Sequence, residues 1–484
     1  MSSLLKITSE SGESSCAPNS RMINIEPSSI VPDKFLGRAA VITLGCAKNR
    51  VDSEVMLGSL VRKGFEIVTD PSEAEIVIVN TCSFLESSVK ESVDAILEVA
   101  ELKEKGRCRQ IFVAGCLVER YKEELKESLP EVDKFISIDD ISHVGDAASS
   151  SFESIIERAA RPYFLYDDTL PRYLSTKQHT AYVKISEGCN RPCTFCIIPK
   201  LRGAMRSREI SSVVKEIEDL AKSGVKEVNL IAQDLTSYGL DRKGPRLAEL
   251  LRAIDASSAM PWVRLLYAYP VGTDEELIRT ISELPSITEY YDIPLQHSSE
   301  SVLKAMKRPI GKFSARKIVN LIKSTSPDIH IRTTFIVGFP GETEKDIQDL
   351  EDFVKQGYFT NLGVFKYSPE PGTEAFNLPG QVSEEEKEAR YSRIMLAQQQ
   401  VVTEHLQQYL GSSLEVLIEG THQDTDLLLS ARTRFQAPEI DGEIIINDIA
   451  EQCQGVTVGA LGEVEVTEIA GYDMVGTLKK IIKR

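Results

Sequence analysis

The chain has 484 residues, with 42% hydrophobic and 27% charged side chains and a formal net charge of −17. This composition is ordinary for a globular protein, and the length is sufficient for about three domains. Such an acidic chain argues against a general nucleic-acid-binding protein, because phosphate contacts need a basic face. No apolar run approaches the roughly 18 residues that a membrane-spanning helix needs.

The amino-terminal segment has the composition of an unfolded extension. Residues 1–37 are rich in serine and lack the basic head and apolar core of a secretory signal. They also contain acidic residues and little arginine, which argues against a mitochondrial transit peptide. We therefore expect a disordered extension over residues 1–37 and a cytoplasmic location.

Residues 38–150 alternate short apolar runs with segments of helical periodicity. The runs AAVITLG, EIVIVN, QIFVAG and DKFISI are typical of strands, and the segments between them are typical of helices. EIVIVN is almost continuously apolar, as in a strand that is buried on both faces. This pattern predicts an α/β domain with a doubly wound parallel sheet.

A cysteine stands just beyond three of these strands. Cys46 follows the first, Cys82 the second and Cys116 the third. Loops at the carboxyl ends of parallel strands converge on the ligand crevice of an open sheet. We therefore expect these three residues to meet as a triad of thiols. The alternative is that they are small apolar residues in buried strands.

Residues 151–178 are interpreted as a connector, after which strand–helix alternation resumes. Six strands with helices between them are expected within residues 179–380. Six βα repeats predict a partial (β/α)6 barrel with right-handed crossovers. Functional residues of such barrels lie at the carboxyl ends of the strands, and four chemically active side chains fall there: Cys189, Asp234, His297 and Glu342.

The last third of the chain begins with a long helical pattern over residues 381–411. Ser383 and Glu386 predict a capping box at its start, and Gly411 predicts its end. Residues 412–484 then change to short strands separated by turns, which predicts a small antiparallel β-barrel. Residues 411–477 contain 13 acidic and two basic side chains, a charge that suits a basic partner.

Three cysteines lie within eight residues in the stretch CNRPCTFC, at Cys189, Cys193 and Cys196. Thiolates bind soft metals and hold iron–sulfur clusters. Three thiolates on a four-iron cluster leave one iron open to a substrate or a cofactor. The alternatives are a zinc site completed by a distant histidine, or three unrelated core thiols. The remaining cysteines match no motif: Cys16, Cys108 and Cys453.

This stretch resembles the signature of the radical S-adenosylmethionine superfamily, with aromatic Phe195 before the third cysteine. The resemblance implies that S-adenosylmethionine chelates the open iron and is cleaved on reduction to a 5′-deoxyadenosyl radical. Residues 333–343 resemble the family's strand beside the adenine, although a buried strand with a glycine turn is the alternative. Contacts with the cofactor are expected at Phe195, Asp234 and Gly338. A basic run after the motif is either a contact for a carboxylate or substrate, or a solvated loop: Lys200, Arg202, Arg206 and Arg208.

The order of the predicted domains is similar to that of the methylthiotransferases over residues 38–480, with a TRAM domain as the small barrel. In that family the amino-terminal triad holds a second 4Fe-4S cluster, whose open iron carries the sulfur to be methylated and inserted. The resemblance assigns one 4Fe-4S cluster to Cys46, Cys82 and Cys116. It assigns the cluster that binds S-adenosylmethionine to Cys189, Cys193 and Cys196, and it implies no catalytic residue beyond these ligands.

Methylthiotransferases fall into two main substrate classes. One class modifies an adenosine beside the tRNA anticodon, and the other modifies an aspartate β-carbon in the small-subunit ribosomal protein S-twelve. The stretches LIAQDLTSYG, YYDIPLQH and RFQAPEIDGEI resemble the second, RimO-type set.

An acidic C-terminal module also favours a basic ribosomal protein, free or in the assembling subunit, over a nucleic-acid substrate. Modification of tRNA is the alternative, and a non-catalytic iron–sulfur carrier is a third hypothesis. The reaction also implies an electron donor, and no membrane partner is expected.

Overall fold

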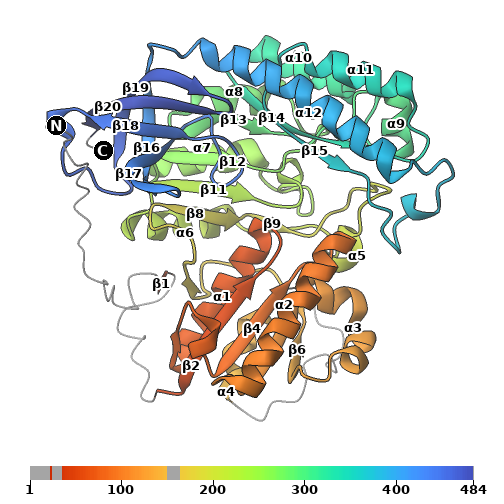
Figure 1. Cartoon of the computed structure of the whole chain (residues 1–484), viewed down its shortest axis with the longest axis vertical. Helices are drawn as coiled ribbons and strands as arrows, with labels where there is room; N and C mark the ends of the chain where they lie inside the picture. Colours follow the sequence, from red (N-terminus) through yellow and green to blue (C-terminus); the bar gives the residue numbers. More distant parts are fainter. Residues whose placement is uncertain (1–21, 24–34, 150–163, 483–484) are drawn as a thin grey trace.

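The structure is a computed structural model that describes residues 22–23, 35–149 and 164–482. Most of the expected extension, including Cys16, and residues 151–163 of the expected connector lie outside the described residues. Figure 1 shows an amino-terminal domain, a central domain and a C-terminal barrel beside the central domain. Among the described helices, none is long and apolar enough to cross a membrane.

The amino-terminal domain is a five-stranded parallel sheet in the order β3-β2-β4-β5-β6. This order confirms the doubly wound fold. The sequence interpretation missed β3, because three residues are too few to show a period. The strands are β2 (Gly37–Thr43), β3 (Phe65–Ile67), β4 (Ile76–Thr81), β5 (Gln110–Gly115) and β6 (Lys134–Ile136). The helices are α1 (Ala47–Lys63), α2 (Glu86–Lys105), α3 (Cys116–Ser128) and α4 (Val144–Ser149).

Helix α1 connects this domain to the next. Every residue from Val51 to Val61 is buried, including charged Asp52 and Glu54. A helix with one face on a sheet shows a single apolar stripe, whereas α1 is covered on its other side by the central domain. The two acids are buried because they pair with bases of that domain, Asp52 with Lys184 and Glu54 with Arg172.

The central domain is a six-stranded parallel sheet in which β8 and β15 form the two edges, as in the expected partial barrel. Its strands are β8 (Thr180–Lys184), β11 (Glu227–Ile231), β12 (Trp262–Leu265), β13 (Ile287–Asp292), β14 (His330–Val337) and β15 (Phe359–Lys366). Its helices are α5 (Ile198–Arg202), α6 (Ile210–Lys222), α7 (Leu247–Ser257), α8 (Glu275–Glu283), α9 (Glu300–Ala305), α10 (Ala315–Thr325) and α11 (Glu344–Val354). Two short antiparallel pairs join β1 (Met22–Ile23) to β7 (Arg172–Tyr173) and β9 (Ser186–Glu187) to β10 (Arg206–Ser207).

Helix α12 (Glu384–Gln407) leads from the central domain to the C-terminal barrel. Ser383 accepts a hydrogen bond from the Glu386 backbone N–H, as expected of an N-cap. The expected capping box is wrong in its second half, because the Glu386 side chain pairs with Arg390 instead of returning to Ser383. The helix also ends at Gln407, before Gly411.

The C-terminal domain is a closed barrel in the order β16-β17-β18-β20-β19, which confirms the predicted β-barrel. Its strands are β16 (Ser413–His422), β17 (Thr425–Thr433), β18 (Ile444–Ile449), β19 (Leu461–Ala470) and β20 (Asp473–Ile482). The expectation of a wholly antiparallel barrel needs one correction, since β18 and β20 are parallel. A closed ring of five strands cannot alternate direction throughout, so one neighbouring pair must be parallel.

The three domains share one hydrophobic cluster. The loop 434–443 between β17 and β18 places Ala437 in contact with this cluster, which also holds Tyr182 and Leu266 of the central sheet and Val51 of α1. These sheet residues point away from the face that the central helices cover, as alternate residues of a strand do. The loop 434–443 and α1 therefore both pack on the inner face of the partial barrel.

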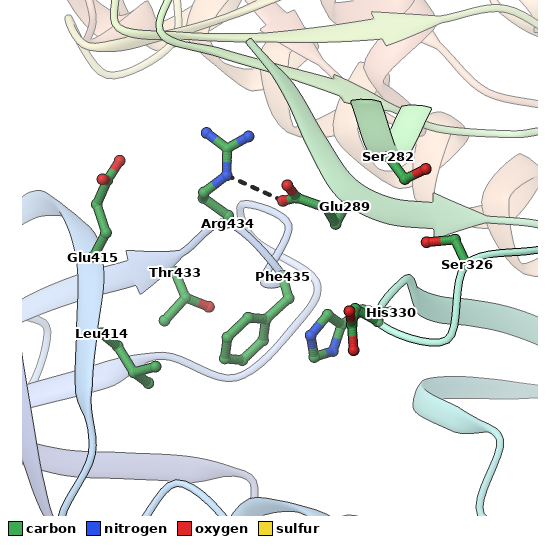
Figure 2. A pocket seen from close by; sticks show the side chains of 10 residues that line it. Ser282, Glu289, Ser326, His330, Leu414, Glu415, Thr433, Arg434 and Phe435 are labelled. Carbon is green, nitrogen blue, oxygen red and sulfur yellow. Dashed lines mark hydrogen bonds and ion pairs between the residues drawn. The ribbon is translucent and has the colours of Figure 1, made fainter. Parts of the chain in front are cut away.

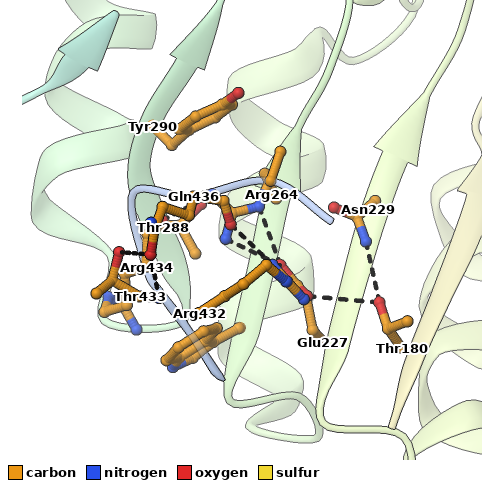
Figure 3. A network of polar contacts seen from close by, with 12 residues as sticks. Thr180, Glu227, Asn229, Arg264, Thr288, Tyr290, Arg432, Thr433, Arg434 and Gln436 are labelled. Atoms are coloured by element: carbon orange, nitrogen blue, oxygen red, sulfur yellow. Dashed lines mark hydrogen bonds and ion pairs between the residues drawn. The ribbon is translucent and has the colours of Figure 1, made fainter. Parts of the chain in front are cut away.

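Buried ion pairs reinforce the contact between the central sheet and the barrel (Figure 3). Glu227 of β11 accepts hydrogen bonds from Arg264 of β12 and from Arg432 of β17. All three side chains are almost fully buried. A pocket of about 370 Å³ opens beside them, where Arg434 bonds to Glu289 and the Phe435 ring stacks on His330 (Figure 2).

Candidate active site

The first cysteine triad forms at the carboxyl ends of three parallel strands, as the sequence predicts. Cys46 precedes α1, Cys82 follows β4 and Cys116 begins α3. The three thiols lie close enough together to interact electrostatically with one another. Gly45 has φ +90°, and a Cβ atom there would lie 3.0 Å from Cys82 Sγ. Only glycine therefore lets the Cys46 and Cys82 loops approach so closely.

Polar groups surround the innermost thiol of this triad. Cys116 Sγ lies 3.6 Å from Arg202 Nη2 and 4.0 Å from Asn49 Oδ1. Burial raises the pKa of the Cys116 thiol to about 11, although the Arg202 guanidinium acts in the opposite direction. Burial also raises the pKa of Cys82. Cys46, by contrast, is exposed, so the triad has an open side.

The second triad lies in one loop between β9 and α5. The Arg191 backbone N–H donates to Cys189 Sγ at 3.4 Å, and Arg308 Nη1 lies 3.9 Å from Cys193 Sγ. The Cys196 N–H donates to the Cys193 carbonyl, which turns the loop so that it brings the thiols together. Burial raises the pKa of Cys196 to about 12.

Helix α5 links the two triads. It begins two residues after Cys196 and ends at Arg202, whose guanidinium reaches Cys116. Ile197 and Leu201 also pack with Cys116 in a small apolar cluster. The two triads are therefore neighbours across the boundary between the amino-terminal and central domains, although 73 positions separate Cys116 from Cys189 in the sequence.

Arg202 is also part of a buried network of charges. Its Nη1 atom lies 2.7 Å from Asp52 Oδ2 and 3.3 Å from Glu187 Oε2. Lys184 Nζ binds the same two carboxylates at 2.6 and 2.5 Å. The Gln233 side chain donates to the other oxygen of Glu187. This arrangement of two bases and two acids holds α1 against the strand ends of the central sheet.

The donor set fits iron–sulfur clusters better than single metal ions. In the described part of the chain, no three His, Cys, Asp or Glu side chains converge closely enough to hold one metal ion. A cluster takes each thiolate on a different iron, so its ligands lie farther apart. Buried thiols with a raised pKa stay protonated until a metal deprotonates them.

The predicted cofactor contacts lie near the second triad, each with protein partners. Phe195 packs against Phe339 and Tyr367. The Asp234 carboxylate accepts hydrogen bonds from Arg191 Nε at 2.7 Å and from the hydroxyls of its neighbours Thr236 and Ser237. The Gly338 backbone N–H donates to Glu342. Contact of Phe195, Asp234 and Gly338 with S-adenosylmethionine stays a prediction.

His297 and Glu342, also expected at strand ends, are buried and face each other, with His297 Nε2 3.4 Å from Glu342 Oε2. Glu342 binds Arg390 of α12 as well. Of the basic run, Arg202 and Arg208 are buried in ion pairs, Arg208 with Glu216. The solvated-loop interpretation therefore fails for these two, while Lys200 is exposed and donates to the Gly372 carbonyl.

Sequence reasoning missed the side chains that hold the triads in place. Asn49, Asp52 and Glu187 contact Arg202, and Arg191 and Arg308 stack on the Tyr269 ring at 4.1 Å. The sequence did contain a signal for these residues, since Asn49 and Asp52 follow Cys46 within one predicted helix. Polar side chains on a buried helix are unusual and point to a specific contact. Cys108 and Cys453 are buried in two other hydrophobic clusters, away from both triads.

Comparisons with known proteins agree with this domain order. Residues 38–137 match the uncharacterized protein family UPF0004, residues 183–354 the radical SAM superfamily and residues 410–478 the TRAM domain. Membership of the radical SAM superfamily implies an iron–sulfur cluster and S-adenosylmethionine as cofactors. A structure of the radical S-adenosylmethionine methyltransferase TsrM from Kitasatospora setae covers 70% of this chain, and the match covers 76% of that chain. It has a TM-score of 0.52 at 17% identity, which shows a shared fold.

Curated relatives extend over nearly the whole chain. The ribosomal protein uS12 methylthiotransferase RimO of Geobacter sulfurreducens is 43% identical over 91% of this chain and 98% of its own. Its counterpart from Anaeromyxobacter sp. (strain Fw109-5) is 46% identical over 91% of this chain and 92% of its own. At this identity and coverage, the chain belongs to the family of ribosomal protein uS12 methylthiotransferases, RimO.

Proposed function

We propose that this protein transfers a methylthio group to the β-carbon of an aspartate in ribosomal protein uS12. The observation that carries the proposal is the meeting of two cysteine triads through Arg202 at the strand ends of two parallel sheets. Relatives that span the chain are named for the same substrate. The proposed domains are an amino-terminal cluster domain (38–150), a radical SAM core (179–380), a linker helix (381–411) and a TRAM-like barrel (412–484).

The donor sets suit two 4Fe-4S clusters. Cys46, Cys82 and Cys116 would hold one, and Cys189, Cys193 and Cys196 would hold the other together with S-adenosylmethionine. When bound, these groups would remove a hydrogen atom from carbon and would provide the methylthio group. Three thiols in each set leave room for one further ligand.

The side chains around the triads orient the loops. An arginine lies beside one thiol of each triad, Arg202 at Cys116 and Arg308 at Cys193. Arg191 is fixed by Asp234 and by the Val271 carbonyl, so its backbone N–H is held toward Cys189. These contacts position the thiols before any cofactor binds.

The charge of the C-terminal barrel supports a basic protein substrate. A cavity of about 530 Å³ lies where the barrel meets the start of β8, and five carboxylates and two cations are among its lining residues: Glu419, Glu439, Asp441, Glu443, Asp473, Lys177 and Arg432. A nucleic-acid substrate needs the opposite charge. We infer that the partner is uS12, free or in the assembling subunit, and that an electron donor reduces the enzyme.

The test is an anaerobic reaction of reconstituted enzyme, reductant and S-adenosylmethionine with uS12 or with unmodified tRNA. Mass spectrometry is expected to find one methylthio group on an aspartate of uS12 and none on the tRNA. A modified adenosine instead would establish the tRNA reaction and refute the proposal. Absence of S-adenosylmethionine cleavage would favour a non-catalytic iron–sulfur carrier.

A further inference from the structure

Lys48 is a cation beside the first triad, and no carboxylate of the described residues forms an ion pair with it. It lies in the first turn of α1, two residues after Cys46, and is partly exposed. Its Nζ atom lies 3.2 Å from the centroid of the Tyr267 ring. Over the described ranges 22–23, 35–149 and 164–482, no carboxylate oxygen lies within ion-pair distance of this ammonium, whereas nearby Lys184 binds two carboxylates.

Tyr267 is held in a strained conformation that places its ring under Lys48. It follows β12 and has φ +74°, which is unusual for an aromatic residue. Two hydrogen bonds fix its backbone, one from its N–H to Asp292 Oδ2 at 2.8 Å and one from the Leu235 N–H to its carbonyl at 3.0 Å. Backbone strain of this kind concentrates at functional sites.

The carboxylate nearest in the fold is already engaged. Asp292, at the end of β13, accepts the Tyr267 N–H and lies 3.8 Å from Arg332 Nε. It is therefore held on the side of Tyr267 and Arg332. Asp292 and Glu187 act on Lys48 only from beyond ion-pair distance, so a carboxylate that arrives from outside can pair with this ammonium directly. The exposed Cys46 marks the side from which that anion can approach.

We propose that Lys48 binds the side-chain carboxylate of the aspartate that receives the methylthio group, and that this contact selects a carboxylate substrate. The inference rests on the proposed function. The β-carbon is bonded directly to that carboxylate, so an ammonium two residues from Cys46 holds the reacting carbon beside the first triad. Adenine has no anionic group to match this ammonium, so the same contact discriminates against a nucleobase.

The experiment measures binding of holoenzyme to full-length uS12 and to a uS12 variant in which the target aspartate is asparagine. The two substrates differ by one charge at almost constant shape. The wild-type enzyme is expected to prefer the aspartate form by about tenfold or more, the effect of one charged hydrogen bond. Lys48→Met is expected to bind the two forms equally, and Lys48→Arg to keep most of the preference.

The matched control is Lys63→Met, which removes the same charge from the far end of α1, where Lys63 pairs with Asp146. This variant is expected to keep the full preference. Iron content and visible absorption report whether Lys48→Met still loads its clusters. If Lys48→Met kept the preference for aspartate, with or without its iron, the assignment of Lys48 would be wrong. Failure of the wild-type enzyme to modify uS12 would instead refute the proposed function itself.

Discussion

Arg202 Nη2 lies 3.6 Å from Cys116 Sγ, although Arg202 belongs to the loop and helix of the second cysteine triad and Cys116 to the first. The same guanidinium binds Asp52 at 2.7 Å and Asn49 at 2.6 Å. Its planar fork can make these contacts together, which a lysine ammonium cannot. Arg202 therefore couples the position of one triad to that of the other.

Replacement of Arg202 tests this coupling. We expect Arg202→Gln to lower the free energy of unfolding by about 3–5 kcal/mol, because Asp52 and Glu187 stay buried with less compensating charge. We also expect loss of iron from the first triad, measured as iron per chain. Arg202→Lys keeps the charge, and its stability and iron content are expected to lie between those of the wild type and Arg202→Gln.

The control for Arg202 is Arg279→Gln, which breaks an exposed pair with Glu275 on the surface of α8. Its effect on stability is expected to be below about 1 kcal/mol. An Arg202→Gln enzyme with normal iron content and normal stability would contradict the role assigned to this residue.

The two triads are expected to fail in different ways when a ligand is removed. Cys193→Ala is expected to abolish reductive cleavage of S-adenosylmethionine, because the second triad loses a thiol. Cys82→Ala is expected to keep cleavage and to stop methylthiolation of uS12. Cys453→Ala is the control, since this thiol is buried inside the C-terminal barrel and is expected to leave both reactions intact. Normal product from either triad variant would refute its assigned role.

Gly45 is expected to be required for the shape of the first triad. Gly45→Ala places a Cβ atom 2.8 Å from Cys82 Cβ in a backbone conformation with φ +90°. We expect the Cys82 loop to shift and iron binding to the first triad to fall. Gly311→Ala is the matched control, because Gly311 also has a positive φ, +65°, but nothing lies within 4 Å of the added atom. Equal iron content in the two variants would contradict this role.

His330 is expected to make stability depend on pH. Burial lowers the pKa of His330 to about 3, with a smaller contribution from His405, and its Nδ1 has no hydrogen-bond partner among the described residues. Above pH 6.5 both the folded and the unfolded chain carry it neutral. Between pH 6.5 and about 3 only the unfolded chain binds the proton. The free energy of unfolding therefore decreases as the pH is lowered, by up to about 1.4 kcal/mol per pH unit.

His330→Phe keeps the stacking on Phe435 and removes the titrating group. Denaturant unfolding between pH 6.5 and 4.5 is expected to show a shallower loss of stability in this variant than in the wild type. His143→Gln, on the exposed surface, is expected to keep the wild-type slope. Identical slopes for His330→Phe and the wild type would show that His330 binds a proton as readily in the folded protein as in the unfolded chain.

Local patterns in the sequence were sufficient for the parallel sheets and for the meeting of Cys46, Cys82 and Cys116. Apolar periodicity reports burial of a strand, and the carboxyl ends of parallel strands share one edge. The patterns failed where the sequence allows more than one partner for a side chain or more than one direction for a strand. Glu386 pairs with Arg390 rather than with the N-cap, and β18 and β20 run parallel because a ring of five strands must contain one such pair.

The sequence by itself determined which cysteines lie together, because three thiols within eight positions must share one loop and strand order places the other three at one edge. Only the tertiary structure decided what surrounds them. Arg202 and Asp52 are 150 positions apart, Lys184 and Asp52 are 132 positions apart, and no local period relates such residues. The contact of Lys48 with Tyr267 and the entry of Ala437 into the shared core arise in the same way, because packing of whole domains selects these neighbours.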